Sequence, residues 1–294
     1  MKNVLLSLLC TLSLSTLGLA ADKGLFTYDA SRALNVDERV TETSASFKVR
    51  DISFSGVNDE KLRAYLVAPQ GEGPYAAILY VHWLGPVNSD RTEFFTEAKN
   101  LAGHGVISLL IDMPWATPNW FKNRKLSDDY EFSIRQVKNL RRALDVLLSE
   151  KNVDKDRVAF VGHDFGAMYG SVLAGVDPRV HYAVFMAATP VFSDWFLLGT
   201  KIQGQELKAY KASMAPLDPT NYAAQENSLP VLFQFSKHDR FVPEERAQLF
   251  FQSASTPKQV LWYEAGHELD DQAAADRVKW LKDKLKLTNH AAGK

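Results

Sequence analysis

The chain has 294 residues, of which 46% are hydrophobic, and this is enough for one large domain with a full core. The formal net charge is −1, which gives no electrostatic case for binding nucleic acid or an anionic membrane. The single cysteine, Cys10, lies in an N-terminal segment that we expect to be removed. The mature protein would then have no disulfide, no thiol nucleophile and no thiolate metal site.

The first 21 residues have the pattern of a signal peptide. A short positive start is followed by an apolar stretch from Val4 to Leu19 and by small residues around Ala20. The apolar span is short for a membrane anchor and lacks flanking stop-transfer charges. We therefore predict that residues 1–21 direct export to the periplasm or out of the cell. Their cleavage would leave no stable membrane anchor.

Residues 22–46 are polar and weakly patterned, and we predict an N-terminal arm. From residue 47 to 287, strand patterns alternate with helical spacing. The first two strands, at 47–54 and 61–68, alternate apolar and polar residues and are predicted to form an antiparallel hairpin. The other predicted strands span 76–81, 106–111, 157–161, 180–187, 229–235 and 259–263. The predicted helices span 91–102, 128–149, 166–175, 243–251 and 270–287.

This alternation predicts an α/β fold with a mostly parallel sheet that helices flank on both faces. Residues 191–228 have no sheet pattern and are predicted to form a short insertion, or lid, before the strand at 229–235. Ligand sites in such sheets lie at the carboxyl ends of the strands. The candidate functional residues directly follow predicted strands: His82–Leu84, Asp164, Asp239 and His267.

The central motif is Gly162-His163-Asp164-Phe165-Gly166, between a buried strand and a helix of small residues. It has the pattern of a nucleophile elbow, a tight turn that exposes one side chain and needs glycines on either side. Serine usually occupies the exposed position, which here is Asp164. A carboxylate can attack a saturated carbon that carries a halide or an epoxide oxygen. The alternative is a protein in which this replacement has abolished the activity.

The order nucleophile, acid, histidine is that of the α/β-hydrolase fold, and the chain resembles this superfamily over about residues 47–287. The hairpin with Leu66-Val67-Ala68-Pro69 and the short insertion resemble the dienelactone-hydrolase-like branch, whose members hydrolyse esters or lactones with Ser or Cys. The elbow instead resembles that of epoxide hydrolases and haloalkane dehalogenases, which use Asp. The large helical cap of that second group is missing, and Phe165 stands where many of them have Trp. The resemblance therefore implies a hydrolase fold with two candidate reaction types.

Asp164, His267 and Asp239 form the predicted triad. His267 follows the last strand and is the expected general base, which would activate water. Asp239 follows the preceding strand and would orient His267 and stabilise the imidazolium. Asp194, just past the strand at 180–187, is a rival for the role of the acid.

The expected oxyanion donors are backbone N–H groups, one from Phe165 and one from the Trp83-Leu84 turn. Opening an epoxide needs an acid, for which Tyr210 and Tyr222 in the insertion are candidates. A leaving halide needs N–H donors, for which Trp83 and Trp195 are candidates. Plain packing is the alternative for all four side chains. The histidines have no ligand spacing, so we predict neither a metal nor a cofactor.

These observations predict an exported α/β-hydrolase that acts on a small molecule. In the main hypothesis Asp164 attacks an electrophilic carbon of an epoxide or alkyl halide, and His267 activates water. One alternative is an ester or lactone hydrolase of the dienelactone-hydrolase type, in which His267 directs water. The other is a non-catalytic protein that keeps the pocket for binding. The sequence indicates no oligomeric state.

Overall fold

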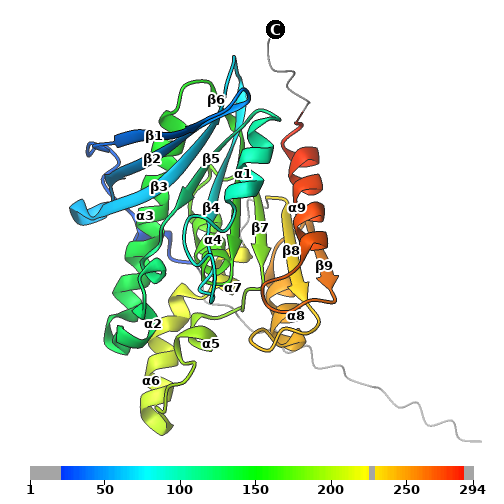
Figure 1. Cartoon of the computed structure of the whole chain (residues 1–294). Coiled ribbons are helices and arrows are strands. Elements are labelled where there is room, and N and C mark those ends of the chain that lie inside the picture. The colour runs from blue at the N-terminus through cyan, green and yellow to red at the C-terminus, as the bar shows by residue number, and fades with distance from the viewer. Residues whose placement is uncertain (1–20, 225–228, 288–294) are drawn as a thin grey trace, which may run out of the picture.

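The computed structural model describes residues 21–224 and 229–287. In this part of the chain, nine strands form one sheet in the order β1-β2-β3-β5-β4-β6-β7-β8-β9 (Figure 1). The neighbours among β1, β2, β3 and β5 pair antiparallel, and every other pair of neighbours is parallel. The strands are β1 (Asp37–Thr43), β2 (Phe47–Ser55), β3 (Lys61–Pro69), β4 (Tyr75–Val81), β5 (Val106–Ile111), β6 (Val153–His163), β7 (Tyr182–Met186), β8 (Val231–Ser236) and β9 (Lys258–Tyr263).

The parallel centre of the sheet accounts for the continuous apolar runs in the sequence. Every residue of β4, β5 and β8 is buried, because helices cover both faces of the sheet there. β2 and β3 instead alternate buried and more exposed positions, as expected of a half-covered antiparallel hairpin. The predicted α/β fold with a mostly parallel sheet is confirmed.

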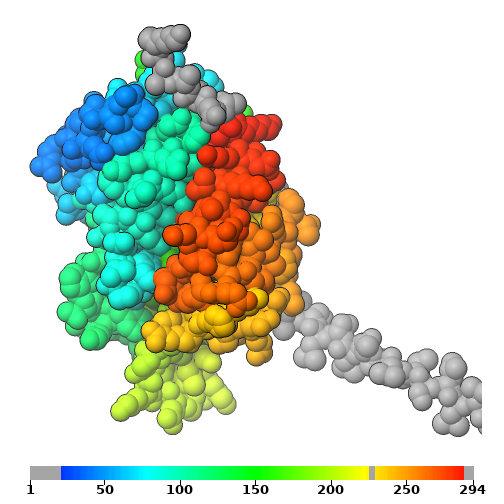
Figure 2. All heavy atoms as spheres, turned by 45° about the vertical axis from the view of Figure 1, so that its right-hand side comes forward, coloured from blue at the N-terminus to red at the C-terminus, as the bar shows by residue number. Residues whose placement is uncertain are grey.

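The helices divide between the two faces of the sheet. Buried residues of α3, α4 and α8 pack in one hydrophobic cluster, and those of α1 and α9 pack in another. α1 and α9 lie side by side, where Arg277 Nη2 is 2.6 Å from Glu97 Oε2, and α9 forms the red strip on the surface in Figure 2. The helices are α1 (Phe95–Ala102), α2 (Trp120–Asn123), α3 (Asp129–Ser149), α4 (Phe165–Val176), α5 (Phe192–Phe196), α6 (Gly204–Met214), α7 (Pro219–Ala223), α8 (Glu244–Ser253) and α9 (Asp271–Lys284).

The predicted insertion at 191–228 is helical over its described part. It contains α5, α6 and α7, and α6 protrudes at the bottom end of the molecule in Figure 1. The carboxyl ends of β7, β8 and β9 point towards the same end. Residues 225–228 lie outside the described part of the chain.

The predicted N-terminal arm at 22–46 also contains a strand, which the sequence analysis did not anticipate. β1 pairs antiparallel with β2 at the edge of the sheet. Six of its seven residues are exposed, so it lacks the alternating apolar pattern by which strands are recognised. The predicted signal peptide lies outside the described residues except for Ala21. No helix in the described part of the chain is long and apolar enough to cross a membrane.

Candidate active site

The turn between β6 and α4 has the geometry of a nucleophile elbow. Asp164 is the single residue between the two elements, and its backbone has φ 55° and ψ −120°. This conformation is strained for a residue with a side chain. A Cβ atom at Gly166 would lie 2.3 Å from the carbonyl oxygen of Val81, and one at Gly162 would lie 2.6 Å from the carbonyl carbon of Gly166. Both glycines are therefore required by close contacts between backbones.

The side chain of Asp164 is fully buried and only partly satisfied by hydrogen bonds. The backbone N–H of Leu84 donates to Oδ2 at 2.9 Å, whereas Oδ1 has no hydrogen-bond partner among the described residues. Burial raises the pKa of Asp164 to about 7, while positive charge on His267 and the N–H groups of Leu84 and Phe165 act in the opposite direction. The carboxyl group of Asp164 is therefore partly protonated near neutral pH.

The structure brings His267 and Asp239 together as the predicted base and acid. His267 Nδ1 lies 2.7 Å from Oδ2 of Asp239, and both side chains are buried. The N–H groups of Phe241 and Val242 donate to the other carboxylate oxygen at 2.8 and 3.0 Å. Burial alone would raise the pKa of Asp239, but the hydrogen bond and charge of His267 and these N–H groups outweigh it, so the pKa is lowered. Asp239 is therefore ionised and fixes the orientation of the imidazole.

Three buried polar atoms at the site have no hydrogen-bond partner in the described part of the chain. They are Oδ1 of Asp164, Nε2 of His267 and the indole Nε1 of Trp195. The Trp195 ring lies 5.2 Å from the His267 ring and 5.8 Å from the ring of Phe165, measured between centroids. Buried polar atoms are normally paired, so these unpaired ones, on two triad residues and on the indole beside His267, indicate groups that are available to a substrate.

The walls around the elbow are aromatic. The ring of Phe165, directly behind Asp164, packs against an aromatic cluster from the loop after β5, from α2, α4 and α5. Its members are Trp115, Trp120, Phe121, Tyr169, Trp195 and Phe196. Such walls exclude water and suit an apolar group of a substrate.

Several predicted residues have other partners. The backbone N–H of Trp83 donates to Glu93 and its indole N–H donates to the carbonyl of Val87, so the predicted role of Trp83 as an oxyanion or halide donor is wrong. Leu84, one residue further along the turn, supplies the N–H instead.

The two tyrosines of the insertion are also engaged elsewhere. Tyr210 donates its hydroxyl to Asp129 at 2.7 Å, and Tyr222 donates to the carbonyl of Pro216 at 3.0 Å. Neither hydroxyl hydrogen-bonds to the residues of the triad, which fits the packing alternative for both. The rival acid Asp194 is paired with Arg246 at 2.5 Å, so Asp239 alone contacts His267.

Glu93 also contacts the elbow, although no pattern in the sequence predicted it. Its two oxygens contact the backbone N–H of Trp83 at 2.7 Å and Nδ1 of His163 at 2.6 Å. Glu93 is 70 residues from His163 in the chain and belongs to no motif, so only the fold reveals the contact. Among the described residues, no three His, Cys, Asp or Glu side chains group in a way that could hold a metal ion.

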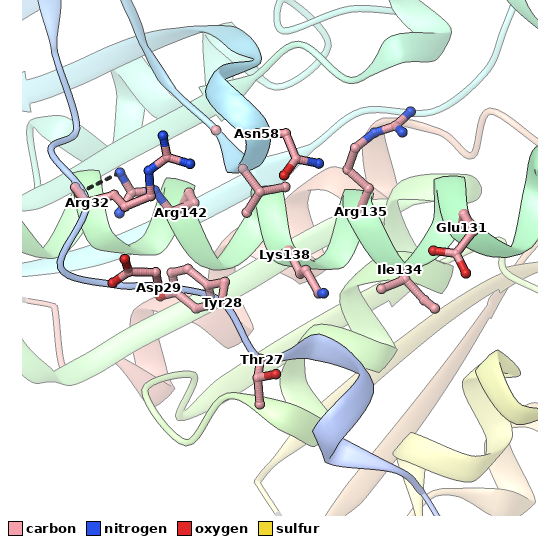
Figure 3. A pocket seen from close by; sticks show the side chains of 12 residues that line it. Thr27, Tyr28, Asp29, Arg32, Asn58, Glu131, Ile134, Arg135, Lys138 and Arg142 are labelled. Atoms are coloured by element: carbon pink, nitrogen blue, oxygen red, sulfur yellow. Dashed lines mark hydrogen bonds between the residues drawn. The ribbon is translucent and has the colours of Figure 1, made fainter.

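A separate cavity of about 320 Å³ lies between the N-terminal arm, the turn after β2 and α3 (Figure 3). None of the predicted site residues lines it. Its three arginines are paired with acidic side chains: Arg32 with Asp59 at 2.7 Å, Arg135 with Glu60 at 3.6 Å, and Arg142 with Asp145 at 3.2 Å. This cavity therefore lacks the reactive groups found at the elbow.

A family model described as "Esterase FrsA-like" matches residues 30–216. The chain belongs to the FrsA-like family. A protein named esterase FrsA from Klebsiella pneumoniae subsp. pneumoniae is 23% identical over 261 residues, which cover 81% of this chain and 59% of the relative. The esterase FrsA of Citrobacter koseri is 25% identical over 257 residues, with the same coverage. The chain thus spans 59% of the length of these FrsA relatives.

Solved structures share the fold of this FrsA-like chain. The acetyl xylan esterase from Paenibacillus sp. R4 superposes with a TM-score of 0.70 at 18% identity, over 89% of this chain and 92% of the other. A protein named as a dienelactone hydrolase from Klebsiella pneumoniae gives 0.58 at 14% identity, over 87% and 99%. These structures confirm the predicted α/β fold with a mostly parallel sheet, and the relatives that the chain matches in sequence are named esterases. The resemblance of the elbow to epoxide hydrolases and haloalkane dehalogenases stays a prediction.

Proposed function

We propose that this protein hydrolyses a small carboxylic ester or lactone, with His267 as the general base and Asp164 at the reacting centre. The observation that carries the proposal is the buried 2.7 Å contact between His267 Nδ1 and Asp239, which leaves Nε2 for the substrate side. The match to the esterase FrsA-like family supports an ester bond as the target. This is the alternative reaction predicted from the sequence, and the relatives favour it over epoxides and alkyl halides.

In the proposed reaction, His267 Nε2 takes a proton from water while the water oxygen bonds to the acyl carbon. The imidazolium then gives that proton to the leaving alkoxide oxygen as the carbon–oxygen bond breaks. When water adds to the acyl carbon, negative charge develops on the former carbonyl oxygen. In our proposal the protonated carboxyl of Asp164 donates to this oxygen, because its pKa of about 7 leaves much of it protonated at neutral pH.

A second candidate is attack by Asp164 on a saturated carbon, as in the main hypothesis from the sequence. It is favoured by the position of the carboxylate, since Oδ2 is held by the N–H of Leu84 while Oδ1 is unpaired. Oδ1 would bond to the carbon as the bond to the leaving group breaks, and the indole N–H of Trp195 would bind that group. Water activated by His267 would then attack Cγ of Asp164 and release the alcohol.

Turnover of a panel of short acyl esters, lactones, epoxides and haloalkanes, by the wild type and by Asp164→Asn, separates these proposals. Asn is shaped like a protonated Asp: its oxygen can accept from the N–H of Leu84, and its amide nitrogen can donate to the substrate oxygen. We expect ester or lactone turnover that survives in part in Asp164→Asn, with deamidation excluded by mass. In ¹⁸O-water the Asp164 peptide should stay unlabelled.

Label in the Asp164 carboxylate, together with loss of all activity in Asp164→Asn, would overturn the ester proposal in favour of the covalent route. In that case Trp195→Phe, which keeps the ring and removes the N–H, should slow release of the leaving group. Ligand retention without any turnover, unchanged by His267→Ala, would instead support the non-catalytic binding protein.

We also propose that the chain is exported. The support is the pattern of residues 1–21, a short positive start, an apolar stretch and small residues at its end. Expression of the full chain in a Gram-negative bacterium should give a shortened protein in the periplasmic fraction. A full-length protein in the cytoplasm would contradict this proposal.

A further inference from the structure

A second carboxylate–histidine pair lies directly beside the triad. Nδ1 of His163 is 2.6 Å from Oε1 of Glu93, and Nε2 of His163 is 3.0 Å from the backbone carbonyl oxygen of His267. His163 is 1% exposed. Its ring also stacks on the indole of Trp83, with centroids 5.0 Å apart and an angle of 7° between the planes. The imidazole is therefore fixed on its edges and on one face.

The partners of His163 fix the orientation of the ring. A carbonyl oxygen can only accept a hydrogen bond, so Nε2 of His163 must carry the proton that it donates to the carbonyl of His267. Nδ1 shares a proton with Oε1 of Glu93 across 2.6 Å. The other oxygen of Glu93 accepts from the backbone N–H of Trp83 at 2.7 Å.

We propose that Glu93 and His163 are positioning residues that hold three parts of the active site in fixed relative positions. Glu93 binds the Trp83-Leu84 turn, whose next N–H contacts Asp164. His163 is the residue directly before Asp164 in the elbow. Through the carbonyl of His267, the pair also binds the loop that carries the general base.

Glu93 and His163 can be buried next to the reacting carboxyl because they share a proton. The two side chains together carry no net charge, so burying them costs less than burying a single charge alone. Glu93 also contributes to the raised pKa of Asp164. The catalytic part of this inference rests on the proposed function, whereas the hydrogen bonds of His163 do not.

The contact of His163 with the loop of His267 can be measured directly by NMR of the full protein with ¹⁵N-labelled histidine. We expect Nε2 of His163 to carry a proton in the wild type, with the signal assigned by its absence in His163→Gln. In Glu93→Gln the amide can donate to Nδ1 while its oxygen still accepts from Trp83, so the proton on Nε2 should remain. A wild-type His163 whose Nε2 carries no proton would overturn the contact with the carbonyl of His267.

The positioning role is tested by two variants that separate the contacts of His163. The amide nitrogen of Gln reaches about as far as imidazole Nε2, so His163→Gln keeps the donor for the carbonyl of His267. The amide nitrogen of Asn reaches only as far as Nδ1, so His163→Asn keeps the contact with Glu93 and loses the other. Because small misplacements in an active site can cost about 10²-fold in rate, we expect kcat of His163→Asn to fall by that order, with KM nearly unchanged.

His163→Gln should recover much of that loss, whereas a purely structural role would show as lowered thermal stability in both variants alike. His181→Asn, at a histidine outside the site, is the matched control and should leave kcat unchanged. Equal kcat for His163→Asn and the wild type would overturn the positioning role. If no substrate is turned over at all, the proposed function fails, yet the NMR result still decides whether His163 binds the carbonyl of His267.

Discussion

The backbone N–H of Leu84 lies 2.9 Å from Oδ2 of Asp164, so the donor that a serine hydrolase offers to its substrate is held here by the protein's own carboxylate. Phe165, the other predicted donor, also acts on the charge of Asp164. A substrate oxygen can reach the N–H of Leu84 only if the carboxylate leaves it. The identity of the elbow residue therefore determines which oxygen atom is stabilised during the reaction.

Asp164→Ser should raise hydrolysis of short acyl esters above that of the wild type. The shorter side chain releases the N–H of Leu84 and places a hydroxyl group within the site that contains His267. One oxyanion donor is worth about 10²–10³ in rate, which sets the scale of the gain. Initial rates with chromogenic short-chain esters measure it. The double variant Asp164→Ser with His267→Ala should lose the gain, and a gain that persists there would contradict a role for His267.

Asp239→Asn should lower kcat by about 10²–10⁴, the usual contribution of a positioned general base. The amide would accept the N–H groups of Phe241 and Val242 but would leave the imidazolium of His267 without its counter-charge. Asp194→Asn is the matched control, because Asp194 contacts Arg246 and not His267. Steady-state kinetics of both variants are the measurement. Equal losses of kcat in the two variants would mean that Asp239 is not the acid of the triad.

The stability of the protein should depend on pH through Asp164. Its pKa is about 7 in the folded state, against about 3.9 for an unfolded chain. Between these values the folded state binds more protons than the unfolded state, so stability from this group is complete below about pH 4 and is lost as the pH rises through 7. Asp164→Asn removes this dependence and should be the more stable protein at pH 8.

Urea unfolding of the wild type and Asp164→Asn at pH 5 and pH 8 tests this expectation. The difference in the free energy of unfolding should be larger at pH 8. Asp218, whose pKa burial also raises to about 7, is present in both proteins and cancels from the comparison. A difference that does not change with pH would mean that Asp164 stays ionised throughout.

Gly166→Ala should destabilise the fold or prevent it from forming. The new Cβ would lie 2.3 Å from the carbonyl oxygen of Val81, and backbone on both sides of the contact cannot move away cheaply. Gly103→Ala is the control, since Gly103 has helical backbone angles and a Cβ there meets only the carbonyl oxygen of Asn100 at 3.4 Å. Thermal melts of the two purified variants should differ by many degrees. Similar melting temperatures would contradict the close packing at the elbow.

The fold could be predicted because its signals are local. Buried parallel strands such as β4 and β5 read as uninterrupted apolar runs, and the glycines at 162 and 166 mark the elbow. Sequence order also placed Asp239 and His267 at strand ends, where the structure brings them into contact. The strand β1 was not predicted because it is exposed at the edge of the sheet and its sequence has no apolar periodicity.

The details of the site could not be predicted because they depend on single backbone atoms. The sequence of the turn does not reveal which of two successive N–H groups points at Asp164. In the structure it is the N–H of Leu84, whereas the N–H of Trp83 donates to Glu93. Tyr210 was expected near the substrate but reaches Asp129 on α3 instead. Glu93 has no neighbouring motif, and its contact with His163 exists only because two distant segments meet.

The complete burial of Asp164 limits how fast a substrate can reach the site. The aromatic ring of Phe241, which is 41% exposed, packs on the ring of His267 with centroids 5.2 Å apart, and Trp195 packs beside it. Because Asp164 has no exposed surface, a substrate reaches its carboxyl only after neighbouring side chains move. The rate of that movement is an upper limit on kcat, and a kcat close to that limit should decrease in viscous solvents.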